Sequence, residues 1–279
     1  MSSQPVQHGR AVERPGAGGA AAPWIEPLAR LGYGAKGVVY LLVGGLAVAA
    51  ALGRGGQTEG SGGAIQHLAA APYGQVLLFT LAVGLLGFVV WRATQALVNP
   101  ENESGRRRAF FVVSGLVYAA LAVEAARSAL GPGGSGSGEA EADHWAATLM
   151  AQPLGQGLVV VVGAALALYG LQQIGKAFTA DLDRRLALGS LSGTSRTWVR
   201  RFGRTGLAAR GIVFSMMGGF LAAAGVTSDP SEARGVGGAL RSLREQPYGP
   251  WLLGAVALGL MAYGLYCLVR ARWRRITPA

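Results

Sequence analysis

The chain has 279 residues, of which 51% are hydrophobic and 14% charged, and it carries a net charge of +11. Soluble domains contain about 25% charged residues, so this composition excludes an ordinary soluble globular protein. The single cysteine, Cys267, excludes a disulfide framework and a thiolate metal site, and we expect it to be a small apolar residue of the last span.

Residues 1–27 are predicted to form a disordered cytoplasmic tail, because they are rich in Gly, Ala and Pro and lack the apolar stretch of a signal peptide. Six later segments each approach the roughly 20 apolar residues that a helix needs to cross a bilayer. They lie at about 35–52, 74–97, 109–130, 154–175, 207–226 and 249–269. The sequence therefore predicts an all-α membrane protein with six transmembrane helices.

The six segments form three copies of one two-helix unit. Each copy has the same turn before its second span, with a proline that we expect at the first position of that helix. The turns are Pro72-Tyr73-Gly74, Pro153-Leu154-Gly155 and Pro247-Tyr248-Gly249. Because each unit has two spans, all copies enter the membrane the same way, which predicts a pseudo-three-fold axis along the membrane normal. The predicted repeats are 28–98, 106–178 and 201–276, with a basic cytoplasmic linker at 179–200.

The first helix of each repeat begins with an arginine, has a polar residue six positions later, and an aromatic residue one turn beyond that. In repeat order these are Arg30, Arg108 and Arg204; Lys36, Ser114 and Arg210; and Tyr40, Tyr118 and Phe214. We expect Lys36 and Arg210 to lie against the rings that follow them while their charged heads reach the cytoplasmic headgroups. The small residues Gly211, Ser215 and Gly219 share one helix face, which predicts close packing against another helix.

Two further patterns recur in the other half of the repeat. The sequence Gly62-Gly63-Ala64-Ile65 returns as Gly237-Gly238-Ala239-Leu240, and each predicts a short amphipathic helix on the outer surface. Each second span carries an aromatic residue near its inner end, and we interpret these rings as an inner aromatic belt. They are Phe88, Tyr169 and Tyr263.

The basic residues are distributed unevenly between the two sides. With the N-terminus in the cytoplasm, 20 of the 25 basic residues fall on inner segments, whereas eight of the 14 acidic residues fall on outer ones. This positive-inside bias predicts a bacterial plasma-membrane protein with both termini in the cytoplasm. The basic clusters lie at the ends of spans, so we expect them to set topology and contact anionic headgroups; binding of nucleic acid is not expected.

Few residues offer chemistry. The three histidines lack metal-ligand spacing, and no phosphate-binding loop or haem motif is present, so no metal or cofactor is expected. Glu124 lies in the third span with Arg127 one turn later; an ionisable residue at this depth is a functional candidate, although the two can also pair with each other. Gln172 and Gln173 in the fourth span are expected to form hydrogen bonds between helices.

The repeated Gly-X-X-Tyr/Phe helix, the Pro-Tyr-Gly turn and the three pairs of spans together resemble the bacterial membrane family called domain of unknown function 1206. The resemblance covers about residues 28–276 and implies a bacterial origin and this fold, but no particular activity. The middle copy departs most from the pattern, with Ser114 in place of a cation and Leu154 in place of the turn tyrosine.

Three functions follow from these patterns. The first is a non-enzymatic scaffold or accessory protein that associates with itself or with other membrane proteins through its small-residue helix faces. The alternative is a small transporter or channel for an anion or another small solute, with a weak candidate binding set of Arg30, Lys36, Arg108, Arg204 and Arg210. A lipid-modifying enzyme that uses Glu124 is the least favoured, because no catalytic partner is visible, and we therefore predict that the protein is not an enzyme.

Overall fold

The structure, a computed structural model, describes residues 25–54, 58, 60–97, 105–131, 138–179 and 193–273. The predicted tail lies almost wholly outside these ranges, as does most of the predicted linker. Within them the regular structure is entirely helical, and the six helices long and apolar enough to cross a membrane confirm the predicted fold class. These six helices are α1 (Ile25–Ala51), α3 (Gly74–Leu97), α4 (Gly105–Leu130), α6 (Gly155–Thr179), α7 (Gly193–Thr227) and α9 (Gly249–Trp273).

Short helices connect the two long helices within each repeat. They are α2 (Ser61–Ala69), α5 (Gly138–Met150) and α8 (Val236–Arg244), with a 3₁₀ turn, η2 (Pro230–Glu232), before α8. We call the end of the bundle that carries them the short-helix side, and the opposite end, where α1 begins and α9 ends, the terminal side. The α7 helix begins at Gly193, inside the segment predicted to be a linker, so it continues on the terminal side well before its apolar part.

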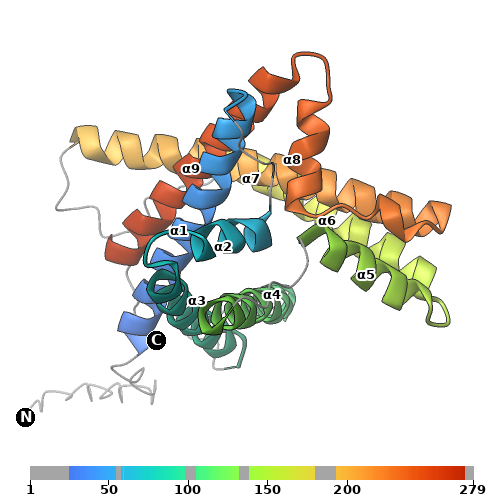
Figure 1. Cartoon of the computed structure of the whole chain (residues 1–279), viewed down its shortest axis with the longest axis horizontal. Coiled ribbons are helices and arrows are strands. Elements are labelled where there is room, and N and C mark those ends of the chain that lie inside the picture. The colour runs from blue at the N-terminus through green and yellow to red at the C-terminus, as the bar shows by residue number, and fades with distance from the viewer. Residues whose placement is uncertain are drawn as a thin grey trace, which may run out of the picture.

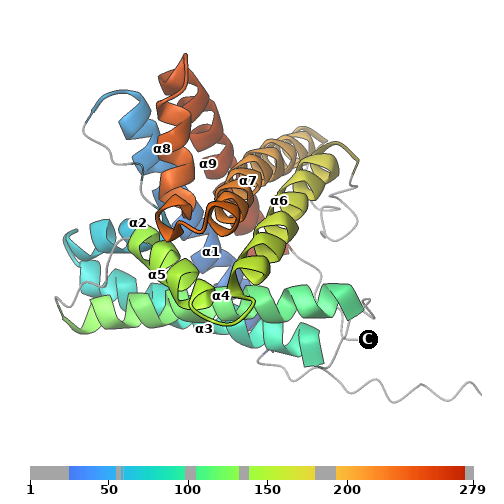
Figure 2. The same cartoon turned by 90° about the vertical axis from the view of Figure 1, so that its right-hand side faces the viewer.

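The long helices pair between repeats rather than within them. The second helix of each repeat packs most extensively against the first helix of the next, as α3 against α4 and α6 against α7. The last helix, α9, closes the ring by packing against α1. This cyclic pattern is the predicted pseudo-three-fold arrangement. Figures 1 and 2 show that the three pairs cross one another around a common centre instead of running parallel.

Glycine allows this close pairing. A Cβ added to Gly211 would fall 2.7 Å from the carbonyl oxygen of Gly170, and one added to Gly37 would fall 2.9 Å from that of Gly264. Such distances leave no room for a side chain, so the helix backbones touch directly. The predicted small-residue face of α7 is partly wrong, because Gly218 meets α6 whereas Gly219 has nothing within 4 Å.

The three Pro-X-Gly turns have one geometry. In each, the glycine N–H donates to the carbonyl three residues earlier, at 2.8, 2.9 and 2.8 Å, and the middle residue has a positive φ of 61°, 64° or 61°. Proline therefore occupies the second position of a β-turn, where its fixed φ is suitable. The expectation that it starts the helix is wrong, since the following glycine does so. That glycine is required because a Cβ there would collide with the end of the preceding short helix.

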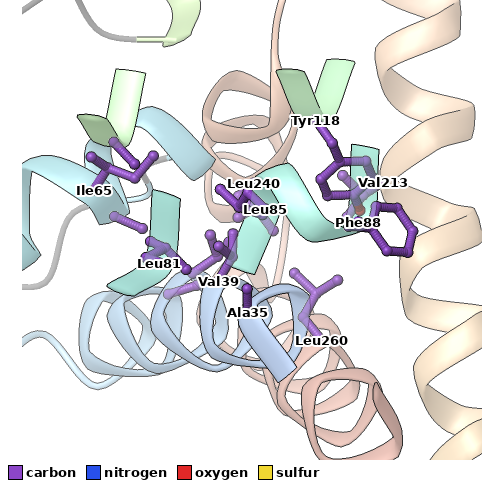
Figure 3. Close-up of a cluster of buried hydrophobic side chains, with 14 of the residues drawn as sticks. Ala35, Val39, Ile65, Leu81, Leu85, Phe88, Tyr118, Val213, Leu240 and Leu260 are labelled. Carbon is purple, nitrogen blue, oxygen red and sulfur yellow. The ribbon is translucent and has the colours of Figure 1, made fainter. Parts of the chain in front are cut away.

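A continuous apolar core fills the centre of the molecule. Figure 3 shows Val39 of α1, Leu85 of α3 and Leu240 of α8 in this core. Ile65 of α2 is also buried, at 1% exposure, and Leu240 at 0%. The two predicted short helices are therefore confirmed as helices, but their apolar faces pack into the bundle.

Candidate functional site

A lysine lies at the centre of the bundle inside a cage of aromatic rings. Lys36 of α1 is only 3% exposed. Its Nζ lies 5.0 Å from the ring centroid of Tyr118, 5.2 Å from that of Phe88 and 5.5 Å from that of Tyr263. The predicted partner, Tyr40, is the fourth ring, at 5.9 Å. These four rings come from α1, α3, α4 and α9, so helices of all three repeats build the cage.

Arg210 of α7 shares a wall of this cage. Its Cζ lies 5.2 Å from the Tyr263 ring that Lys36 also contacts, and 4.5 Å from the predicted ring of Phe214. Its Nε donates to the Tyr40 hydroxyl at 2.9 Å, and its Nη1 makes a longer contact of 3.4 Å to the Tyr263 hydroxyl. Lys36 and Arg210, which occupy equivalent positions in repeats 1 and 3, are thus joined through the same two tyrosines.

Two more arginines extend the cluster toward the terminal side. Arg92 of α3 has its Cζ 4.9 Å from the rings of both Phe88 and Phe111, and its Nη1 donates to Gln95 at 2.9 Å. The Arg92 Nε is buried and has no hydrogen-bond partner among the described residues. Arg270 of α9 lies against Tyr33 and donates to its hydroxyl at 3.0 Å.

The rings follow the three-fold pattern of the helices. Each pair of neighbouring helices contributes one ring from each helix, in contact with each other. These pairs are Tyr40 with Tyr263, Phe88 with Tyr118, and Tyr169 with Phe214, at centroid distances of 4.8, 4.7 and 5.7 Å; the second is visible in Figure 3. We call these six rings, with Lys36, Arg92 and Arg210, the central cluster. The inner-belt interpretation is wrong for Phe88 and Tyr263, which are 0% and 2% exposed.

The charge of the central cluster is unbalanced. No described carboxylate bonds to Lys36, Arg92, Arg210 or Arg270. Burying one cation at membrane depth costs about 3 kcal/mol on insertion scales, and a desolvated cation–π contact contributes up to about 2 kcal/mol. Contacts with the rings can therefore offset the free-energy cost of burying each cation. They do not remove the electrostatic repulsion between the cations. An arrangement of this kind attracts an anion.

The structure divides the predicted cationic set. Lys36 and Arg210 meet in the central cluster, and the expectation that their heads reach the headgroups is wrong, because both are buried. Arg30 and Arg108 instead cap helix ends: Arg30 donates to the Arg272 carbonyl at 2.8 Å and Arg108 to the Ala96 carbonyl at 2.7 Å. Cations at a helix C-terminus stabilise its exposed carbonyls. The third equivalent, Arg204, is exposed.

Among the described residues, the predicted intramembrane polar residues form no hydrogen bond with the side chains of the central cluster. Glu124 is 9% exposed and Arg127 is exposed, and within the described residues they form no ion pair with each other. Gln172 is exposed and accepts a hydrogen bond from Lys176 of its own helix, at 2.9 Å. Gln173 is buried at 6% exposure, at the repeat position that Arg92 holds in the first copy.

Residue patterns alone missed Arg92 and the inward direction of the rings. The signal is nonetheless in the repeat: both ring positions are aromatic in all three copies, and the position one turn after the second ring is Arg92, Gln173 or Cys267. A lipid-facing belt would not need the polar residues that the first two copies have there, Arg92 and Gln173. Among the described residues no group of three His, Cys, Asp or Glu side chains lies close enough to hold a metal ion.

The family described as Domain of Unknown Function (DUF1206) matches the chain three times in tandem, at residues 31–99, 109–180 and 205–274. The chain belongs to this family. It is also 36% identical over 262 residues to the "Uncharacterized protein YxxB" of Bacillus subtilis (strain 168), covering 91% of this chain and 93% of that protein. No solved structure matches it. Membership accounts for the three-fold repeat, and no enzyme class is indicated by these relatives.

Proposed function

We propose that this family member is a non-enzymatic transporter or channel that binds a small anion at the centre of its helix bundle. The supporting observation is the pair of buried cations, Lys36 and Arg210, held between shared tyrosine rings without a described carboxylate. A buried guanidinium such as that of Arg210 places a positive charge at the centre of the bundle, and such a charge lowers the electrostatic barrier to an anion crossing the membrane. The protein resides in the bacterial plasma membrane with both termini in the cytoplasm, in agreement with its basic span ends.

A scaffold role has less support. The sequence suggested this role through its small-residue helix faces. In the structure, Gly37 packs against α9 and Gly211 packs against α6. These glycines are used to assemble the chain itself and are unavailable to a partner protein. A stoichiometric protein partner that co-purifies from native membranes would nevertheless favour the scaffold over transport.

Flux measurements on purified protein in liposomes test the transport proposal. Bromide entry is followed by quenching of an entrapped halide-sensitive dye, with a potassium gradient and valinomycin to drive it. We expect the wild-type protein to accelerate entry and Arg210→Gln to reduce the rate at least tenfold. Arg204→Gln is the matched control, because it removes an exposed arginine of the same helix. Iodide and thiocyanate, which quench the same dye, are run alongside bromide, and equal entry of all three with and without protein would refute transport of small anions.

A further inference from the structure

A cavity lies directly against the central cluster on its short-helix side. Its volume is about 30 Å³, and its lining includes Tyr40 and Arg210 together with Ser61 and Val236. Apolar side chains of α1, α7 and α9 form the walls. About 10–15 Å³ in this measure holds one water molecule, so the cavity has room for about two waters or one monatomic ion.

Ser61 and Val236 are the first residues of α2 and α8. The two helix starts approach each other closely, since a Cβ on Gly60 would lie 3.4 Å from the Gly237 nitrogen. Both views show α2 and α8 extending outward from this common middle (Figures 1 and 2). Two helix N-termini, one from repeat 1 and one from repeat 3, therefore meet at the same cavity.

Neither N-terminus receives a side-chain cap from the residues that the structure describes. The residues before the helices are Gly60 and Gly235, and neither provides a side-chain hydrogen bond to the first turn. The first helical bonds are donated by Ala64 and Ala239, and the N–H groups of Ser61 and Val236 donate to no described group. Free N–H groups at the positive end of a helix dipole, equivalent to about half a charge, form an anion site.

Arg210 supplies an independent, full positive charge to the same cavity. It is 8% exposed, and while its Nε and Nη1 bond the two tyrosines, its Nη2 donates to no described group. Its charge also has no described carboxylate partner. A cation with an unused donor thus lines the same cavity as two helix starts that no described side chain caps.

We propose that this cavity is the anion-binding site, and that it selects small monovalent anions of the halide kind. The inference rests on the proposed function and names its substrate class. The anion lies between Arg210 and the first N–H groups of α2 and α8. The volume admits one halide ion after loss of its hydration shell and excludes phosphate or a carboxylic metabolite. Tyr40, whose hydroxyl accepts a hydrogen bond from Arg210 Nε, also lines the cavity.

Thermal unfolding in detergent, followed by tryptophan fluorescence, tests the site without any flux. We expect sodium bromide to raise the Tm of the full-length protein relative to sodium gluconate at equal ionic strength. In Ser61→Asp the new carboxylate takes the anion's place, so the bromide-dependent rise should be lost. Aspartate is favourable in the first turn of a helix, so α2 should still form. Val236→Asp makes the same change in α8 and serves if Ser61→Asp does not fold.

The matched control is Ser195→Asp, the same substitution in the first turn of α7 at the opposite end of the molecule, which should keep the full bromide effect. A bromide effect that survives both Asp variants would overturn the site. If bromide flux is present but both variants keep the bromide-dependent rise in Tm, the proposed site is wrong and the transport proposal stands. If the shift follows the variants but liposomes show no flux, the site stands and transport fails.

Discussion

At the scale of single residues, Lys36 is the most unusual side chain in the molecule. Its ammonium is surrounded by four rings and donates to no hydrogen-bond acceptor among the described residues. Aromatic cages of this kind commonly bind cationic ligands. Here the cage is filled by a side chain of the protein itself, which holds the Lys36 amine against the same Tyr263 ring that Arg210 contacts.

Lys36→Met separates a structural from a functional role of this charge. Met fills a similar volume and its sulfur packs well against aromatic rings, while the repulsion from Arg210 disappears. We therefore expect the variant to be more stable by about 1 kcal/mol and to conduct anions more slowly. Stability is measured by thermal unfolding in detergent and conduction by the dye assay. A destabilised variant with normal flux would mean that the lysine serves only to hold the rings together.

The sequence could predict the pairing of each cation with its nearest ring, since Lys36–Tyr40 and Arg210–Phe214 are neighbours on one helix. It could not predict that both heads turn inward. Long cationic side chains near a span end usually reach the headgroups, and only the packing of α1, α7 and α9 around the axis decides otherwise. Arg92 was overlooked for the same reason, because its burial depends on rings from α4.

At the scale of helices, glycine-to-carbonyl contacts determine which helices pair. The contact between Gly170 of α6 and Gly211 of α7 is reciprocal, because a Cβ on either residue would approach the other's carbonyl oxygen to 2.6 or 2.7 Å. The sequence predicted that Gly211 packs closely against another helix, but not which one. Short connections suggest pairing within a repeat, whereas the closest packing is between repeats.

Gly170→Leu tests this element-level contact. The new side chain would collide with the backbone of α7, so the two helices must separate, and we expect a loss of about 3 kcal/mol or failure to fold. Gly175→Leu in the same helix is the matched control, because no atom of the described residues lies within 4 Å of its added Cβ. Unfolding in SDS mixtures measures both. Equal stability of the two variants would contradict the observed α6–α7 packing.

At the scale of the whole molecule, the three helix pairs are related by the pseudo-axis, but the middle repeat is the weakest copy. The long helices of repeats 1 and 3 also pack within their own repeats, as α1 with α3 and α7 with α9. In the middle repeat, the rings of Phe110 and Tyr169 stack between α4 and α6 at 4.7 Å. The sequence signalled this difference, since Ser114 replaces a cation there.

The orientation of the bundle in the membrane is testable with single cysteines. Cys267 is buried and is first replaced by Ala, so that it cannot be labelled itself. Glu245→Cys places an exposed thiol on the short-helix side and Ser195→Cys one on the terminal side. With cytoplasmic termini, a membrane-impermeant maleimide added to intact cells labels the first variant only. Labelling of the second variant alone would reverse the orientation and require the anion site to be reached from the cytoplasm.

The closing of α9 onto α1 has a consequence for how the site arose. Three separate copies of a two-helix subunit could assemble into the same ring, but they would place three identical residues around the axis. Fusion into one polypeptide removes that restriction, and the equivalent positions here are Lys36, Ser114 and Arg210. Joining the subunits end to end therefore allowed three different residues, a lysine, a serine and an arginine, at equivalent positions, which no homotrimer can encode.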